Sequence, residues 1–236
     1  MTDTNINIIA DTKEKIISLL APTGWGEKLR IFLKGGEMDV LLDRLLTESQ
    51  EGRHFTPTLK DVFAAFVKCP FNKTKVIFMG QDPYPYLGVA DGLAFSCSKT
   101  GRLQPSLKYM LKAVEEQTKT PQNDPDLTRW ADQGVLLLNS ALTCQIDKVG
   151  SHYDIWKDFI FMVIDAINFS NPEAIFVLMG KQAQSFASYI SPTNPVVKIS
   201  HPASAAYASA IRWECDDCFN KINQTLIIQR KEPIKW

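Results

Sequence analysis

Four short runs of apolar residues constrain the fold of this chain more than any other feature. The runs are Val76–Met79, Val135–Leu138, Ala174–Leu178 and Val196–Ile199. Helical periodicity marks the stretches that alternate with them, which are Ser106–Glu116, Tyr153–Asn168, Gln182–Tyr189 and Cys218–Gln229. Continuously apolar strands that alternate with helices are typical of a parallel sheet covered on both faces. We therefore expect an α/β fold: a three-layer α/β/α domain around a central, mainly parallel four-stranded sheet.

The first part of the chain has a different pattern, because charged and apolar residues alternate there at helical spacing. This holds for residues 13–20, 27–33 and 38–46. Thr58 is suited to cap a further helix that has Asp61 at its third position. No repeat, low-complexity segment or linker divides the 236 residues. We therefore expect a single domain over residues 1–236, with an N-terminal helical part (1–55) and a catalytic core (56–236).

Composition excludes several classes of protein. Lys plus Arg and Asp plus Glu both number 26, so net charge gives no indication of a nucleic-acid partner. No apolar run approaches the roughly 18 residues of a membrane span, and the polar start Met1–Asn5 is unlike a secretory signal. Five cysteines are an odd number for a disulfide framework. We expect a cytoplasmic protein in a reducing compartment, without a membrane partner.

Polar residues follow each of the four predicted strands. The strands run into Gly80-Gln81-Asp82, Asn139-Ser140, Gly180-Lys181 and Ser200-His201-Pro202. Ligands bind outside the carboxyl ends of such strands, so one edge would gather an acid, an amide, a lysine and a histidine. Each also has a structural alternative: a turn at Asp82, a helix cap at Asn139, a strand-to-helix turn at Gly180 and a structural role for His201.

Other catalytic and cofactor sites find less support in the sequence. Ser200 and His201 do not suggest a nucleophilic pair, because neighbours on an extended chain point to opposite sides. The three histidines lack metal-ligand spacing, and the pair Cys215 and Cys218 has no second pair beside it. A zinc or iron–sulfur site would need long-range assembly. No glycine-rich nucleotide motif occurs, so we expect no nucleotide cofactor.

Several motifs resemble the first family of uracil-DNA glycosylases. Gly80-Gln81-Asp82-Pro83-Tyr84 is similar to that family's water-activating motif. The other matching segments are Gly92–Ser96, Trp130–Asn139 with Leu142-Thr143, Ser151-His152 with Trp156, and Ser200-His201-Pro202. The similarity covers roughly residues 55 to 236, and more loosely the first helices.

The resemblance implies hydrolysis of the bond between uracil and deoxyribose in DNA, without a metal or cofactor. The target base must first leave the stack, because its bond is unreachable inside a duplex. Asp82 would orient the attacking water and offset the positive charge that develops on the sugar. His201, as a neutral imidazole, would stabilise the uracil anion.

The resemblance also implies how the base is selected. Phe95 would stack on the flipped ring, and the carboxamide of Asn139 would match uracil O4 and N3–H. Cytosine presents the opposite pattern and would leave buried groups unpaired. Tyr84 would stand against C5, where thymine has its methyl group. Backbone amides at Gln81 would help to bind O2.

The contacts to DNA depart from the family pattern. Pro85 and Asp91 stand where histidine is common, and Ala205 aligns with a leucine that wedges into the duplex. Tyr207 or Ile211 is our candidate for a substitute wedge. Alanine replaces two phosphate-binding serines at positions 203 and 206, and Lys181 replaces a serine and could recover phosphate affinity by its charge. The candidate DNA-binding residues are Pro105, Ser106, Lys181, Ser204, Ala205 and Tyr207.

The implied partner is uracil-containing DNA, single- or double-stranded. A DNA-mimicking inhibitor protein is a further candidate partner, and we expect a monomer. Two other functions compete with this one. A DNA-binding scaffold would not need the full set of pocket and catalytic residues, which are Asp82, Tyr84, Phe95, Asn139 and His201. A hydrolase of free nucleosides would not need the candidate phosphate contacts Ser106 and Lys181.

Overall fold

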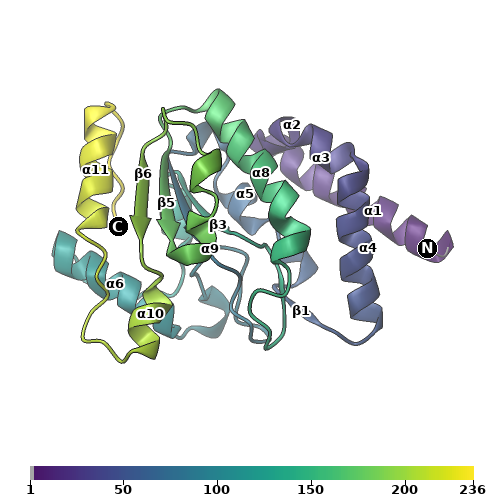
Figure 1. The fold of residues 1–236 in the computed structure, drawn as a ribbon, viewed down its shortest axis with the longest axis horizontal. Coiled ribbons are helices and arrows are strands. Elements are labelled where there is room, and N and C mark those ends of the chain that lie inside the picture. The colour runs from purple at the N-terminus through teal and green to yellow at the C-terminus, as the bar shows by residue number, and fades with distance from the viewer. Residues whose placement is uncertain (1–2) are drawn as a thin grey trace.

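A parallel four-stranded sheet forms the centre of the computed structural model, which describes residues 3–236 (Figure 1). Its strands are β2 (Val76–Gly80), β3 (Val135–Asn139), β5 (Ile175–Met179) and β6 (Val196–Ile199). They pair in the order β3-β2-β5-β6, and all three pairings are parallel. The four predicted strands are therefore confirmed within one residue at each end. Gly80 and Asn139 lie opposite each other where β2 and β3 end.

The burial of the strands explains why the sequence showed them so clearly. Every residue of β2, β3 and β5 is buried, which matches their uninterrupted apolar runs. The edge strand β6 is different, because Val196 and Lys198 are exposed. A charged side chain on an edge strand discourages pairing with another sheet.

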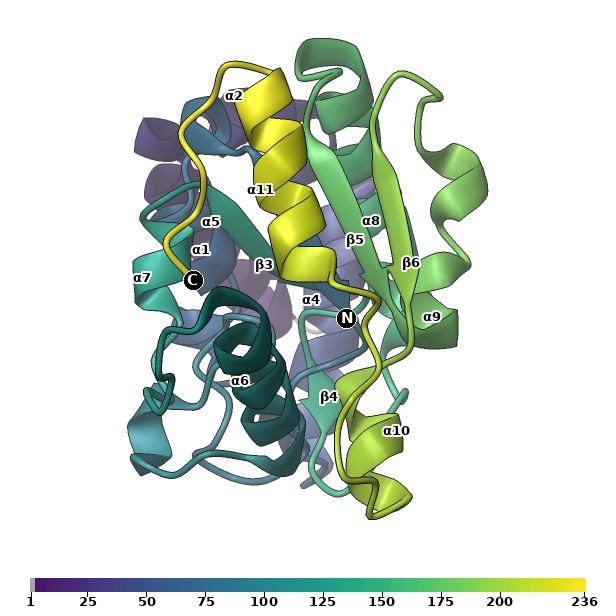
Figure 2. The same cartoon turned by 90° about the vertical axis from the view of Figure 1, so that its left-hand side faces the viewer.

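Helices cover both faces of the sheet, which confirms the three-layer arrangement (Figures 1 and 2). One face is covered by α6 (Pro105–Thr118) and α11 (Cys218–Ile228), and Phe219 of α11 packs against Phe78 of β2 with ring centroids 6.1 Å apart. On the other face lies α8 (Tyr153–Ser170). The short α9 (Gly180–Gln184) follows β5 directly.

The N-terminal helices pack beyond α8 and share its core. They are α1 (Asp3–Leu20), α2 (Trp25–Lys28), α3 (Arg30–Lys34) and α4 (Gly36–Gln50). Trp25 is fully buried, and its indole N–H donates to the carbonyl oxygen of Cys69 at 2.9 Å. One continuous cluster of buried apolar residues extends from Ile9 to Trp236. The helical part and the rest of the chain therefore share one hydrophobic core.

Three helix predictions were wrong in detail. The stretch 27–33 is interrupted at Leu29, where α2 has ended and α3 has not yet begun. Thr58 caps no helix; its hydroxyl donates to the Asp61 carboxylate at 2.5 Å, and only a 3₁₀ turn (Leu59–Asp61) follows before α5 (Ala64–Lys68). The helix expected over 182–189 breaks into α9 and a 3₁₀ turn at Ala187–Tyr189.

Four short elements were not predicted. They are β1 (Phe55–Thr56), β4 (Cys144–Gln145), α7 (Thr128–Ala131) and α10 (Pro202–Tyr207). The strands β1 and β4 form a separate antiparallel pair. Elements of two to six residues are too short to establish a periodicity.

Candidate active site

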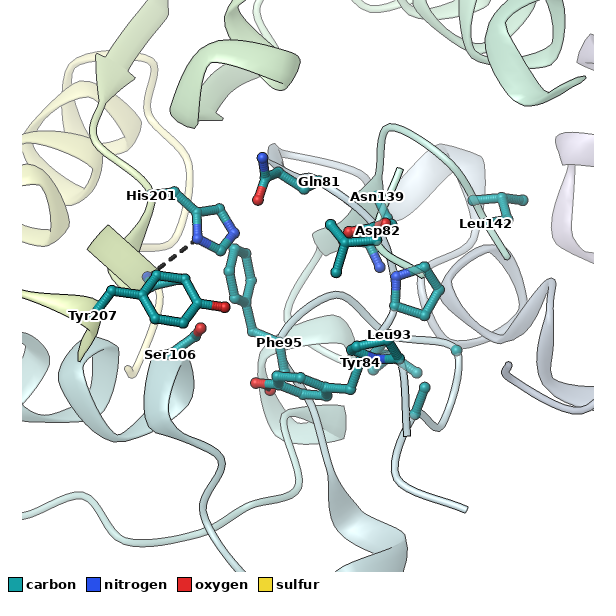
Figure 3. Close-up of a pocket in the computed structure, with 16 residues that line it drawn as sticks. Gln81, Asp82, Tyr84, Leu93, Phe95, Ser106, Asn139, Leu142, His201 and Tyr207 are labelled. Atoms are coloured by element: carbon teal, nitrogen blue, oxygen red, sulfur yellow. Dashed lines mark hydrogen bonds between the residues drawn. The ribbon is translucent and has the colours of Figure 1, made fainter. Parts of the chain in front are cut away.

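A cavity of about 180 Å³ opens at the carboxyl ends of β2 and β3 (Figure 3). Eight residues predicted from the sequence line it together. They are Gln81, Asp82, Tyr84, Phe95, Ser106, Asn139, His201 and Tyr207. The acid, the amide and the histidine expected at the strand ends thus meet in one cavity, whereas the expected lysine, Lys181, is not part of its lining. The cavity is also lined by residues that the sequence did not single out, including Ala90 and Val149.

Asp82 is held by a residue far away in the sequence. The backbone N–H of Gly150 donates to Asp82 Oδ2 at 2.5 Å, across 68 positions. Burial raises the pKa of Asp82 to about 6, although the hydrogen bond from Gly150 opposes this shift. With a pKa of about 6, the Asp82 carboxyl group gains and loses a proton close to neutral pH. A general base is most effective when its pKa lies near the working pH.

His201 is neutral, and its tautomer is fixed. Its Nδ1 accepts a hydrogen bond from the backbone N–H of Ala203 at 3.1 Å, drawn in Figure 3. Burial lowers the pKa of His201 to about 4. Since Nδ1 is an acceptor, the ring hydrogen lies on Nε2, which is free to donate into the cavity.

A hydrogen bond to Ser200 is a second argument against a nucleophilic pair formed by Ser200 and His201. The indole N–H of Trp213 donates to Ser200 Oγ at 2.9 Å, which holds that hydroxyl in another contact. Gly180, with φ +86°, lies beneath His201, and a Cβ at Gly180 would come within 2.9 Å of His201 Cβ. The glycine of the strand-to-helix turn therefore makes room for the histidine, in addition to starting α9.

Phe95 and Asn139 meet over the end of β2. Phe95 has a φ of +69°, which is unusual for a bulky residue, and Tyr84 Oη donates to its carbonyl oxygen at 2.8 Å. A Cβ at Gly80 would lie 2.7 Å from Asn139 Oδ1 and 3.1 Å from the Phe95 ring. The lack of a side chain at Gly80 thus allows Asn139 and Phe95 to pack closely against the end of β2.

Asn139 caps no helix. The chain turns after β3, and the N–H groups of Ser140 and Ala141 donate back to the carbonyl oxygens of Gly80 and Gln81. The structural alternative for Asn139 was therefore wrong, and its buried carboxamide lines the cavity instead.

Asp91 supports the loop that presents Phe95. Its Oδ2 accepts from Ser96 Oγ at 2.7 Å and from both the N–H and Oγ of Ser98, and its Oδ1 accepts from the Leu93 N–H. The carboxylate that replaces a histidine is therefore engaged in binding its own loop. These bonds give Asp91 a structural role in the loop.

The remaining predicted DNA contacts lie outside the cavity lining. Pro105, Lys181 and Ser204 are exposed. Ala205 is only 7% exposed and belongs to the hydrophobic core, so its side chain is not presented at the surface. Tyr207, at the end of α10, and Ile211 beyond it are each 88% exposed.

Metal binding and membrane insertion find no support in residues 3–236. No group of three or more His, Cys, Asp or Glu side chains within that range is arranged to hold a metal ion. All five cysteines are free. Within the same range, none of the helices combines the length and apolar character needed to cross a membrane.

A half-buried carboxylate and a histidine line one cavity together with an aromatic ring and a carboxamide. Such a lining, at the carboxyl ends of strands in an α/β fold, suits a planar heterocyclic ligand. A family model described as the uracil DNA glycosylase superfamily matches residues 66–227. The chain belongs to this superfamily.

Individual relatives match over nearly the whole chain. A uracil-DNA glycosylase of Acinetobacter baumannii (strain SDF) is 34% identical over 227 residues, which is 95% of each chain. One from Leuconostoc mesenteroides is 33% identical over 92% of this chain and 98% of its own. Among solved structures, mimivirus uracil-DNA glycosylase has a TM-score of 0.83 at 23% identity, over 93% of this chain and 88% of that one. That structural likeness concerns the fold.

Proposed function

We propose that Asp82 and His201 are the two catalytic residues of a reaction on uracil in DNA. The reaction itself is that of the superfamily: the chain is a hydrolase that removes uracil from DNA by cleaving the N-glycosyl bond. One observation carries the assignment of residues. A carboxylate and an imidazole of fixed tautomer line the same cavity as Phe95 and Asn139.

Asp82 acts on the sugar side. As the bond from C1′ to N1 breaks, positive charge develops on the deoxyribose, and an ionised Asp82 offsets it. The same carboxylate orients a water molecule towards C1′ and takes up the proton that the water loses on attack. The raised pKa of Asp82 suits this transfer, because a carboxylate with a pKa of about 6 is a better proton acceptor than an ordinary one.

His201 acts on the base side. The electron pair of the broken bond stays with uracil, whose negative charge spreads from N1 onto O2. The Nε2–H of the neutral ring donates a hydrogen bond to that oxygen and stabilises the anion. Because the pKa of His201 is lowered to about 4, the ring acts as a hydrogen-bond donor at neutral pH and is not a source of a full proton.

Three side chains select the base. Phe95 stacks on the flipped ring, and Asn139 offers the donor and acceptor that match uracil O4 and N3–H. Tyr84 stands against C5, and its hydroxyl is fixed on the Phe95 carbonyl, so the ring that excludes a methyl group is held in place. A mismatched base would leave buried polar groups unpaired, which a hydrogen-bonding site rejects strongly.

The activity and its rivals are tested by one assay. Oligonucleotides with a single uracil, single- and double-stranded, are incubated with the protein and a chelator, and the abasic product is cleaved and measured. We expect product from both forms. A DNA-binding scaffold would retain the DNA without releasing uracil, and a nucleoside hydrolase would act on deoxyuridine but leave both oligonucleotides intact.

We further propose that Tyr207 is the residue that fills the space left by the flipped base. It lines the mouth of the cavity and is almost fully exposed, whereas Ala205 is buried. The segment behind it is anchored on α6, since Tyr109 Oη donates to the Ala210 carbonyl at 2.6 Å and Lys112 Nζ donates to that of Ile211 at 2.8 Å. An aromatic wedge on a braced segment can stack in the duplex.

Replacing Tyr207 with alanine is expected to lower activity on duplex uracil about tenfold, while activity on single strands changes less than about twofold. The reason is that a wedge offsets a part of the few kcal/mol needed to unstack a base, and a single strand needs little unstacking. The measurement is kcat/KM on both substrates. Ile211→Ala is the competing variant, and Ile228→Ala, at a similarly exposed site on α11, is the control. Equal losses on both substrates would contradict the wedge.

Three further expectations belong to the proposal. An inhibitor protein named UGI is bound in solved structures of mimivirus enzyme variants. The same kind of DNA-mimicking partner is a candidate here, because it would have to cover the same cavity. We also propose a monomer of one domain, supported by the shared hydrophobic core, in a reducing compartment, supported by the five free cysteines.

A further inference from the structure

Glu48 is a buried carboxylate for which the proposed reaction has no use. It lies in α4, in the N-terminal helical part, and is 0% exposed. A buried charge is costly unless it is paired and hydrogen-bonded. Besides Arg44 of the same helix, its partners are Gln145 and His152, which lie about 100 positions further along the chain.

Every Glu48 oxygen is occupied. Its Oε2 accepts from His152 Nε2 at 3.0 Å and from Gln145 Nε2 at 2.8 Å, and its Oε1 is paired with Arg44. Although burial opposes ionisation, the hydrogen bonds from Gln145, Arg44 and His152 lower the pKa of Glu48 to about 2. The carboxylate is thus charged at every pH at which the enzyme would work, and it only accepts.

The chain of hydrogen bonds continues with a defined direction. Since a carboxylate accepts, His152 Nε2 carries the ring hydrogen, and the bare Nδ1 accepts from Thr143 Oγ1 at 2.7 Å. The Thr143 oxygen in turn accepts from the Trp156 indole N–H at 2.7 Å. Burial lowers the pKa of His152, which keeps this ring neutral. Glu48 therefore fixes both ends of the segment from residue 143 to residue 152.

The same segment holds the Asp82 loop at three points. Cys144 Sγ donates to the Pro83 carbonyl at 3.3 Å, and the Asp147 N–H donates to that of Pro85 at 2.8 Å. The third contact is the bond from the Gly150 N–H to Asp82 Oδ2. This one segment therefore contacts both Glu48 and the Asp82 loop.

We propose that Glu48 is a positioning residue for Asp82, acting through the 143–152 segment that sets the place of the Gly150 N–H. The inference rests on the proposed function, in which Asp82 is catalytic. Glu48 touches neither substrate nor water in this role. Through Glu48, helix α4 of the N-terminal part would help to set the position of the Asp82 carboxylate.

The ionisable groups around Asp82 allow a clean readout. Burial raises the pKa of the neighbouring Cys144 to about 12 and also raises that of Tyr153, so both stay neutral near pH 6. His201, in the same cavity, has its pKa lowered to about 4 and therefore titrates below Asp82. The upper part of the acidic limb of the pH–rate profile thus reports the ionisation of Asp82. Loss of the Gly150 hydrogen bond, which favours the charged form, would move that limb to higher pH.

The first test compares Glu48→Ala, Glu48→Gln and Glu51→Gln on a single-stranded uracil oligonucleotide. We expect Glu48→Ala to lower kcat about tenfold with KM unchanged within about twofold, and to shift the acidic limb upwards. Glu48→Gln keeps an acceptor oxygen for Gln145 and His152 and should recover most of kcat. The exposed Glu51 at the end of the same helix is the matched control. If Glu48 had only a structural role, Glu48→Ala would lower the melting temperature and leave the acidic limb of the pH–rate profile unchanged. That result would overturn the proposal.

The second test does not depend on activity. In protein labelled with ¹⁵N-glycine, which contains 12 glycines, the Gly150 amide signal should follow the titration of Asp82 in the wild type. Gln145→Leu removes one anchor only and should weaken that response even if Glu48→Ala fails to fold. An unchanged Gly150 response in Gln145→Leu would overturn the proposal. If the wild type released no uracil but Gly150 still titrated, the proposed function would fail and the positioning contact would stand.

Discussion

Replacing Asp82 with asparagine is expected to lower kcat about a thousandfold. Asparagine has a similar shape and keeps an oxygen for the Gly150 N–H, but it neither offsets positive charge on the sugar nor accepts a proton from water. General-base groups contribute about 10² to 10⁴ in rate. The measurement is single-turnover release of uracil from a single-stranded oligonucleotide. A loss of less than tenfold in the folded variant would remove Asp82 from the role proposed here.

The same substitution should stabilise the protein at pH 8. The folded pKa of Asp82, about 6, lies above the ordinary value of 3.8, so ionisation disfavours the folded state as pH rises between these values. Asparagine avoids this cost, which is about 3 kcal/mol above pH 6 and vanishes below about pH 4. Thermal unfolding of both proteins at pH 4 and pH 8 measures it. Equal differences at both pH values would contradict the raised pKa.

Replacing His201 with leucine is expected to lower kcat by about 10² to 10³, the usual effect of losing one donor to a developing oxyanion. Leucine fills a similar volume in a half-buried place but cannot donate to uracil O2. His54→Asn is the matched control, because His54 is exposed and outside the cavity lining. Retention of kcat in His201→Leu would show that the uracil anion is stabilised by other groups.

In His201→Leu, the pH dependence of stability should change in the direction opposite to the change in Asp82→Asn. His201 has a folded pKa of about 4, below the ordinary 6.5, so in the wild type it destabilises the folded state as pH falls from 6.5 to 4. Over the same range the Asp82 shift stabilises it. The two effects oppose each other in the wild type. In His201→Leu, stability should therefore rise on acidification from pH 6 to 4, and in Asp82→Asn it should fall more steeply.

The sequence was sufficient to predict the sheet and the core of the pocket. The strands are buried along their whole length, so apolar runs located them, and parallel strands place their carboxyl ends at one edge. Asp82, Asn139 and His201 could be expected to meet for that reason alone. The residues proposed to stack on or select the base, such as Phe95 and Tyr84, needed the family resemblance, because nothing in their local pattern differs from that of an ordinary loop.

The groups that hold the pocket together could not be predicted. Gly150 reaches Asp82 across 68 positions, and Glu48 reaches His152 across 104. Such contacts depend on how loops return over the sheet, and periodicity carries no information about this. The role of Asp91 could not be predicted for a related reason: nothing in the sequence identifies Leu93, Ser96 and Ser98 as the residues that donate hydrogen bonds to its carboxylate.

Gly80 lies behind two of the side chains that line the cavity. A Cβ at this position would lie 2.7 Å from Asn139 Oδ1 and 3.1 Å from the Phe95 ring, so a larger residue would displace one or both of them. The volume of the cavity therefore depends on a residue that does not itself line it. A search for variants of altered substrate range that samples only the lining residues would miss position 80, where every substitution is expected to crowd the space.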